Sequence, residues 1–170
     1  MERATPEVET LQHAYVDRKN DKDLEMRLWE VQGVLMCRTG GVDAGLKLLA
    51  RCVEKTKNDF RHHSWGGGAY FMEIWGAEAL HGDRPDVAEE AFLEALAHDP
   101  GSVRGALGMQ VLCERQGRSE EARRFAELAR RCWSRADAHD FEIELVAMRG
   151  EPVSTHQNTS GEPHGSASRR

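Results

Sequence analysis

Apolar residues recur along the chain at the spacing of α-helices. The first run consists of Leu24, Leu28, Val31 and Leu35, three or four positions apart. Asp23, a residue type that favours a helix N-cap, precedes this run, and the glycine pair at 40–41 ends it. The alternation of apolar and polar residues that would indicate β-strands is almost absent. The pattern therefore predicts an all-α fold.

The predicted helices come in pairs. A second apolar run predicts a helix that ends at about Lys57, and the glycine turn before it is short enough to make the first two helices antiparallel. The same spacing predicts two more hairpins and a single last helix, at 70–81 with 87–98, at 103–116 with 120–132, and at 136–149. The chain should be a series of helical hairpins.

Small and large residues of the hairpins superpose at constant offsets. An offset of 34 residues relates Ala88, Phe92 and Ala95 to Ala122, Ala126 and Ala129. An offset of 43 relates Trp29, Gly33, Gly45, Leu49 and Cys52 to Met72, Gly76, Ala88, Phe92 and Ala95. The nine extra residues fall between Asp59 and Gly68. A fixed period of this length is typical of helical repeat proteins.

This pattern resembles the tetratricopeptide repeat (TPR) family, whose unit is a helix-turn-helix of 34 residues. The matching residues are Trp29, Gly33, Met36, Gly45, Leu49 and Cys52 in the first unit, and Gly76, Ala88, Phe92, Ala95 and Pro100 in the second. The third unit departs, with Gln110 in place of glycine and Ala126 in place of an aromatic residue. The resemblance implies an α-solenoid of three repeats, at about 26–59, 69–102 and 103–136, with a C-terminal capping helix at 136–149.

The repeat domain is expected to span residues 23–150, between an N-terminal segment and a C-terminal tail of different character. In the N-terminal segment, residues 1–22, Thr5 can cap a short helix whose apolar side chains are Val8, Leu11 and Tyr15. The tail at 151–170 is rich in Ser, Gly, Pro and Thr, and we expect it to be disordered because it offers almost no apolar surface to bury.

Composition narrows the possible binding partners and the cellular compartment of the protein. The formal net charge of −6 over 170 residues disfavours nucleic acid and anionic membrane surfaces as partners. The sequence shows neither a membrane-spanning segment nor a secretory signal. The four cysteines (Cys37, Cys52, Cys113 and Cys132) are scattered singly, which predicts reduced and mostly buried thiols. We expect a cytoplasmic protein.

The segment RHHSWGGGAYF, residues 61–71, carries the densest candidate chemistry. A metal site would use His62 and His63, but neighbouring residues on a helix point about 100° apart, so they do not share a face. The glycines at 66–68 lack the preceding strand and the following Gly-Lys-Ser/Thr of a phosphate-binding loop. We interpret the segment as a joint between helices with Ser64 as an N-cap, and we expect no metal and no cofactor.

Catalytic and nucleic-acid-binding patterns are weak. The chain has no Gly-x-Ser-x-Gly elbow and no cysteine in a nucleophile motif, so an enzyme is not expected. Seven arginines gather around the last repeat: Arg115, Arg118, Arg123, Arg124, Arg130, Arg131 and Arg135. They make a nucleic-acid surface an alternative, but acidic rather than aromatic residues lie between them, which favours a solvated outer face.

The TPR resemblance implies a groove that binds a peptide and is lined by the first helix of each unit. The residues that it places on the free face are Arg27, Glu30, Arg38, Tyr70, Glu73, His81, Arg104, Leu107, Glu114 and Arg115. The expected function is a non-enzymatic scaffold for a protein or peptide partner. Two alternatives remain open: a homo-oligomer formed through an exposed repeat face or Trp133, and a binder of a metal or small ligand at His62 and His63.

Overall fold

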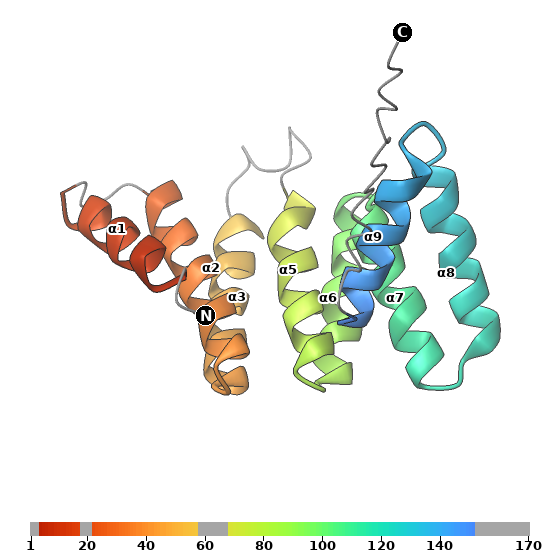
Figure 1. Cartoon of the computed structure of the whole chain (residues 1–170), viewed down its shortest axis with the longest axis horizontal. Helices are drawn as coiled ribbons and strands as arrows, with labels where there is room; N and C mark the ends of the chain where they lie inside the picture. The colour runs from red at the N-terminus through yellow and green to blue at the C-terminus, as the bar shows by residue number, and fades with distance from the viewer. Residues whose placement is uncertain (1–3, 18–21, 58–67, 152–170) are drawn as a thin grey trace, which may run out of the picture.

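The computed structural model describes residues 4–17, 22–57 and 68–151, which form eight α-helices and no strand (Figure 1). The helices are α1 (Ala4–Asp17), α2 (Lys22–Arg38), α3 (Val42–Lys57), α5 (Gly68–His81), α6 (Pro85–His98), α7 (Val103–Arg115), α8 (Ser119–Cys132) and α9 (Ala138–Arg149). The all-α prediction is confirmed for this part of the chain. His62, His63 and Ser64 of the predicted joint, its first two glycines and the tail at 152–170 lie outside the described residues. None of the described helices is long and apolar enough to cross a membrane.

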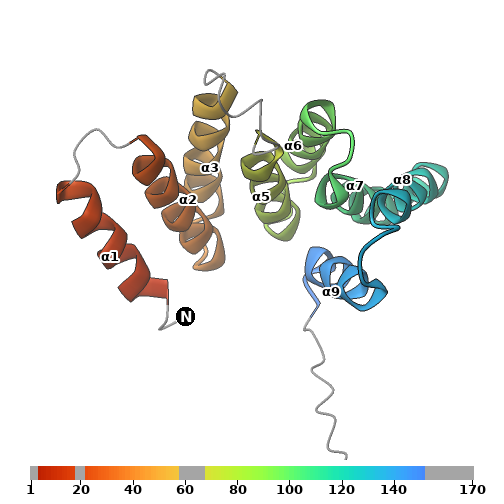
Figure 2. The same cartoon turned by 90° about the horizontal axis from the view of Figure 1, so that it is seen from above.

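The helices pack as consecutive pairs. α2 with α3, α5 with α6, and α7 with α8 form antiparallel hairpins that stand side by side (Figure 1). α3 packs against α5, and α6 packs against α7, which joins one pair to the next. α1 packs against α2, and its Val8 is buried. α9 packs against α7 and lies on the side of the row to which α2, α5 and α7 belong (Figure 2).

Helix ends fall near the predicted positions, and the differences have local causes. α2 begins at Lys22, so Asp23 lies inside the helix and not at an N-cap. α6 begins at Pro85, ahead of the predicted start, because proline is favourable in a first turn where its missing N–H is not needed. α9 begins only at Ala138, because the side chain of Asp137 accepts a hydrogen bond from the backbone N–H of His139 and caps the helix there.

The turns inside the three hairpins share one backbone pattern. Gly40, Asp83 and Gly117 have positive φ angles of 96°, 56° and 73°. The residue after each of them donates a backbone hydrogen bond across the turn: Gly41 to Met36, Arg84 to Ala79, and Arg118 to Cys113, over 2.8, 2.8 and 2.9 Å. The offsets of 43 and 34 residues relate all three turns, so they describe a structural repeat as well as a sequence pattern.

Small residues face large ones where the two helices of a hairpin meet. A Cβ added to Gly33 would lie 2.9 Å from Cγ of Leu49, and one added to Gly76 would lie 2.6 Å from the ring of Phe92. In the third hairpin the sizes are exchanged between equivalent positions: Gln110 on α7 stands where the others have glycine, and Ala126 on α8 stands where they have a large residue. Both are buried. The glycines therefore let the paired helices of the first two hairpins approach closely.

The four cysteines are free thiols. Cys52 and Cys113 are buried, Cys37 is partly buried, and Cys132 is exposed, so the prediction of mostly buried thiols holds for all but the last. Burial raises the pKa of Cys37 to about 11 and the pKa of Cys52 to about 12. Both thiols are therefore protonated at neutral pH, which makes them poor nucleophiles.

Candidate functional site

A cavity of about 260 Å³ opens where α2, α5, α7 and α9 meet. Its lining combines apolar and charged side chains: Val34, Arg38, Glu73, Ile74, Ala77, Glu78, His81, Arg104, Glu144, Ala147 and Met148. Four of the predicted groove residues, Arg38, Glu73, His81 and Arg104, are thus brought together at one site. The first helices of all three hairpins contribute to it, and α9 supplies the remaining wall.

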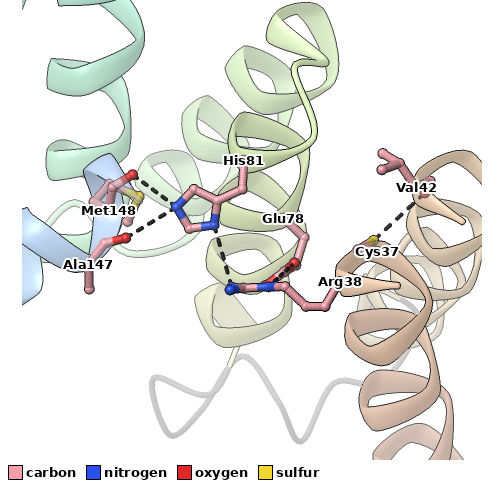
Figure 3. Close-up of polar contacts among 7 residues, drawn as sticks. All are labelled: Cys37, Arg38, Val42, Glu78, His81, Ala147 and Met148. Atoms are coloured by element: carbon pink, nitrogen blue, oxygen red, sulfur yellow. Dashed lines mark hydrogen bonds and ion pairs between the residues drawn. The ribbon is translucent and has the colours of Figure 1, made fainter. Parts of the chain in front are cut away.

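Arg38 and Glu78 form a bidentate pair across the first two hairpins. The Nε of Arg38 lies 2.8 Å from Oε2 of Glu78, and its Nη2 lies 2.6 Å from Oε1 (Figure 3). Glu78 is only 5% exposed, whereas the side chain of Arg38 is 56% exposed. The pair therefore neutralises a carboxylate that is buried, and the hydrogen bonds to Glu78 raise the pKa of Arg38.

His81 connects α5 to the last turn of α9. Its Nε2 lies 3.1 Å from the carbonyl oxygens of both Ala147 and Met148, and its Nδ1 lies 3.4 Å from Nη2 of Arg38 (Figure 3). Carbonyl oxygens only accept hydrogen bonds, so Nε2 carries the proton and Nδ1 accepts from the guanidinium. The imidazole is therefore fixed in one tautomer and binds the carboxyl end of α9.

A second bidentate pair joins α7 to α9. The Nε and Nη2 of Arg104 each lie 2.9 Å from an oxygen of Glu144. These hydrogen bonds raise the pKa of Arg104. Both arginines of the cavity are thus already engaged by carboxylates of the chain, on the donor edge that would otherwise hold an acidic ligand.

Glu73 differs from the other two carboxylates of the cavity. It accepts a hydrogen bond of 2.7 Å from the hydroxyl of Ser102, and among the described residues it forms no ion pair. The same hydroxyl accepts from the N–H of Gly105 and caps α7, which fixes its position. Burial raises the pKa of Glu73, because its charged form is poorly hydrated.

Three other predicted groove residues form a cluster between α2 and α5. The hydroxyl of Tyr70 donates to Glu30 over 2.6 Å, and Nη1 of Arg27 donates to the other oxygen of Glu30 over 2.8 Å. The guanidinium of Arg27 also lies over the ring of Tyr70, 5.0 Å from its centre. Glu30 itself is buried, Tyr70 is half-buried, and Arg27 is the exposed member of this cluster.

The predicted groove residues of α7 contact α9. Arg115 donates to the carbonyl oxygens of Leu80 and Arg149, over 2.8 and 3.1 Å, and Glu114 forms an ion pair with Arg149. Leu107 is fully buried, which corrects the expectation that its side chain lies on the free face. It belongs to the same core cluster as the apolar face of α9, and α9 packs against α7.

Sequence reasoning missed the contribution of α9 to this site. The spacing of Phe141, Leu145 and Met148 indicated one apolar face, and all three are buried. That spacing does not say which helix the face contacts, and nothing local marks Glu144 as a partner of Arg104. Trp133, a candidate for self-association, contacts Phe141 edge to face and donates to the carbonyl of Asp137 over 2.6 Å.

Comparisons of the chain with protein-family models, with curated proteins and with solved structures find no match. Within the described residues, no group of three or more His, Cys, Asp or Glu side chains is placed to hold a metal ion. The metal hypothesis at His62 and His63 concerns residues outside that part of the chain. Function must therefore be inferred from the geometry of the cavity and of the hairpins that form it.

Proposed function

We propose that the chain is a short helical repeat scaffold of the TPR type, a cytoplasmic and non-enzymatic protein that binds a peptide or protein partner on the side formed by α2, α5 and α7. Two observations support the repeat assignment. The hairpin turns share one hydrogen-bond pattern at the two sequence offsets, and glycine faces a large side chain in the first two hairpins. In repeat arrays, the equivalent helices of successive units together present one extended surface.

The observation that carries the proposal is the convergence of three equivalent helices on one cavity. Side chains of α2, α5 and α7 surround about 260 Å³ that combines apolar walls with a few oriented polar groups. Sites that recognise ligands typically have this composition. The cavity is small for a whole peptide, so it fits one anchoring side chain, and the Tyr70 and Arg27 cluster extends the contact surface along α2 and α5.

A variant that fills the cavity tests this function. Ala77 lines the cavity, so Ala77→Trp places an indole in the proposed anchor site. Ala97 on α6 is exposed, and Ala97→Trp adds the same surface elsewhere as a matched control. Wild-type protein and the Ala97 variant should capture the same partner from a lysate of the source cell, and the Ala77 variant should lose it.

Circular dichroism and thermal melting of both variants establish that the helices are intact. Equal capture by the Ala77 variant and the control, with both variants folded, would contradict the proposal that the partner enters the cavity. Capture lost from both variants would show that the loss is not specific to the cavity, which would also contradict the proposal.

A further inference from the structure

The carboxylates of the cavity outnumber its guanidinium groups. Glu73, Glu78 and Glu144 line it, against Arg38 and Arg104. Each arginine binds one carboxylate through its Nε and Nη2, so Glu78 and Glu144 are matched and Glu73 is left without an ion pair among the described residues. The cavity is therefore complementary to a cation.

An acidic ligand fits the cavity poorly. To bind the Nε and Nη2 edge of either guanidinium it would have to displace Glu78 or Glu144, and the displaced carboxylate would lose its hydrogen bonds to that arginine. The imidazole of His81 offers no free donor, because its Nε2 proton already faces two carbonyl oxygens. An anion in the cavity would also approach the charge of Glu73.

The walls around Glu73 are apolar. Ile74 and Ala77 on α5, Val34 on α2 and Met148 on α9 line the same cavity. A side chain with an aliphatic stem and a charged tip matches this arrangement, since the stem can lie on the apolar wall while its tip reaches a carboxylate. One oxygen of Glu73 already accepts from Ser102. A compact ammonium group needs only the other oxygen, whereas the planar guanidinium of arginine binds best to both.

We propose that the cavity binds a lysine side chain of the partner, with its ammonium group on Glu73 and its methylene chain against Ile74, Ala77 and Met148. This inference rests on the proposed function and specifies the chemistry of the anchor residue. The burial that raises the pKa of Glu73 agrees with this inference. Water stabilises the buried carboxylate poorly, and an incoming ammonium group would stabilise its negative charge instead.

Three capped pentapeptides that differ in one residue test the inference on the full chain. They have the form acetyl-Gly-Gly-X-Gly-Gly-amide, where X is lysine, norleucine or glutamate. Norleucine keeps the aliphatic stem and lacks the charge. Binding is followed by NMR through the methyl groups of Ala77 and Met148. The lysine peptide should shift both signals in a saturable way and bind about tenfold more tightly than the norleucine peptide. The glutamate peptide should cause no saturable shift.

Two variants assign the effect to one carboxylate. Glu73→Gln keeps the shape of the side chain and removes its charge. It should weaken binding of the lysine peptide about tenfold and leave binding of the norleucine peptide unchanged. Glu90→Gln removes an exposed charge on α6 and should change neither. Equal binding of the lysine and norleucine peptides, saturable binding of the glutamate peptide, or an unchanged affinity of the lysine peptide for the Glu73 variant would each overturn the inference.

Failure here can be told apart from failure of the proposed function. A partner that is captured by wild type, lost from the Ala77→Trp variant and retained by Glu73→Gln overturns the lysine anchor and leaves the scaffold function standing. A partner that is captured equally by the Ala77 variant overturns the use of the cavity altogether.

Discussion

The ring of Phe92 on α6 lies directly against the backbone of Gly108 on α7. A Cβ added to Gly108 would come within 2.3 Å of Cζ of this ring, and the opposite contact is with Gly76, where a Cβ would lie 2.6 Å from the ring. Phe92 is fully buried, so one aromatic side chain fills the space among three helices from two hairpins. The two glycines and the ring must therefore be considered together.

Gly108→Ala should destabilise the protein by about 1–3 kcal/mol, because the added methyl group forces the ring or α7 to move. Denaturation by urea measures this change. Gly41→Ala is the control, since a Cβ there meets its nearest atom at 3.4 Å, an ordinary contact distance. Adding Phe92→Leu to the Gly108 variant should cost less than it costs in wild type; equal costs in the two backgrounds would show that the ring and the glycine are not coupled.

Asp83→Gly should stabilise the protein by about 0.5–1 kcal/mol, because aspartate pays a backbone penalty at a positive φ that glycine avoids. The equivalent turn positions hold glycines, so Gly117→Ala should destabilise by about 1 kcal/mol. Thermal melting of the two variants gives the comparison. A lower melting temperature for the Asp83 variant would mean that its side chain stabilises the turn by more than the backbone penalty.

Arg38→Met should cost about 1–2 kcal/mol, because it leaves Glu78 buried without a partner. The exposure of the arginine keeps this cost below that of a fully buried pair. Arg123→Met removes one partner of an exposed pair with Glu120 and should cost clearly less than the Arg38 substitution. Equal losses from the two substitutions in urea denaturation would contradict the burial of Glu78.

Glu73→Gln should raise the melting temperature near neutral pH and change it little in acid. Burial holds the pKa of Glu73 above its value in the unfolded chain, so the unfolded state loses the proton first. The native state therefore loses stability as the pH rises through this titration, and the glutamine variant escapes that loss. Melting temperatures at about pH 3 and about pH 7.5, with Glu90→Gln as control, measure the difference. A variant less stable than wild type at the higher pH would reverse the sign and contradict the prediction.

The hairpins could be predicted because their signals are local. Glycine turns such as 40–41 lie beside the helices that they end, and Gly33 and Leu49, which contact each other, are only a short distance apart in the sequence. The exchange of small and large residues at Gln110 and Ala126 was visible as a departure from the family pattern, and both residues are buried. The sequence pattern alone gave no physical reason for that exchange of sizes.

The candidate site was only partly predictable, because its missing members come from distant positions. Arg38, Glu73, His81 and Arg104 were expected on one surface and do line one cavity. The pairs that engage the two arginines involve Glu78 and Glu144, each 40 residues from its partner in the sequence. Leu107 was placed on the free face because the resemblance, although it implied a capping helix, did not say that this helix packs against that side of α7.

The contacts of His81 also bear on the order of folding. Most helix contacts join neighbours in sequence, a topology that favours rapid folding. The chain of hydrogen bonds from Arg38 through His81 to Met148 instead links the first hairpin to the last helix. It requires α2, α5 and α9 to be in place together, so it forms after the hairpins have stacked. These hydrogen bonds are thus expected to close only when all three helices are in place, and the cavity beside them is complete only in the fully folded chain.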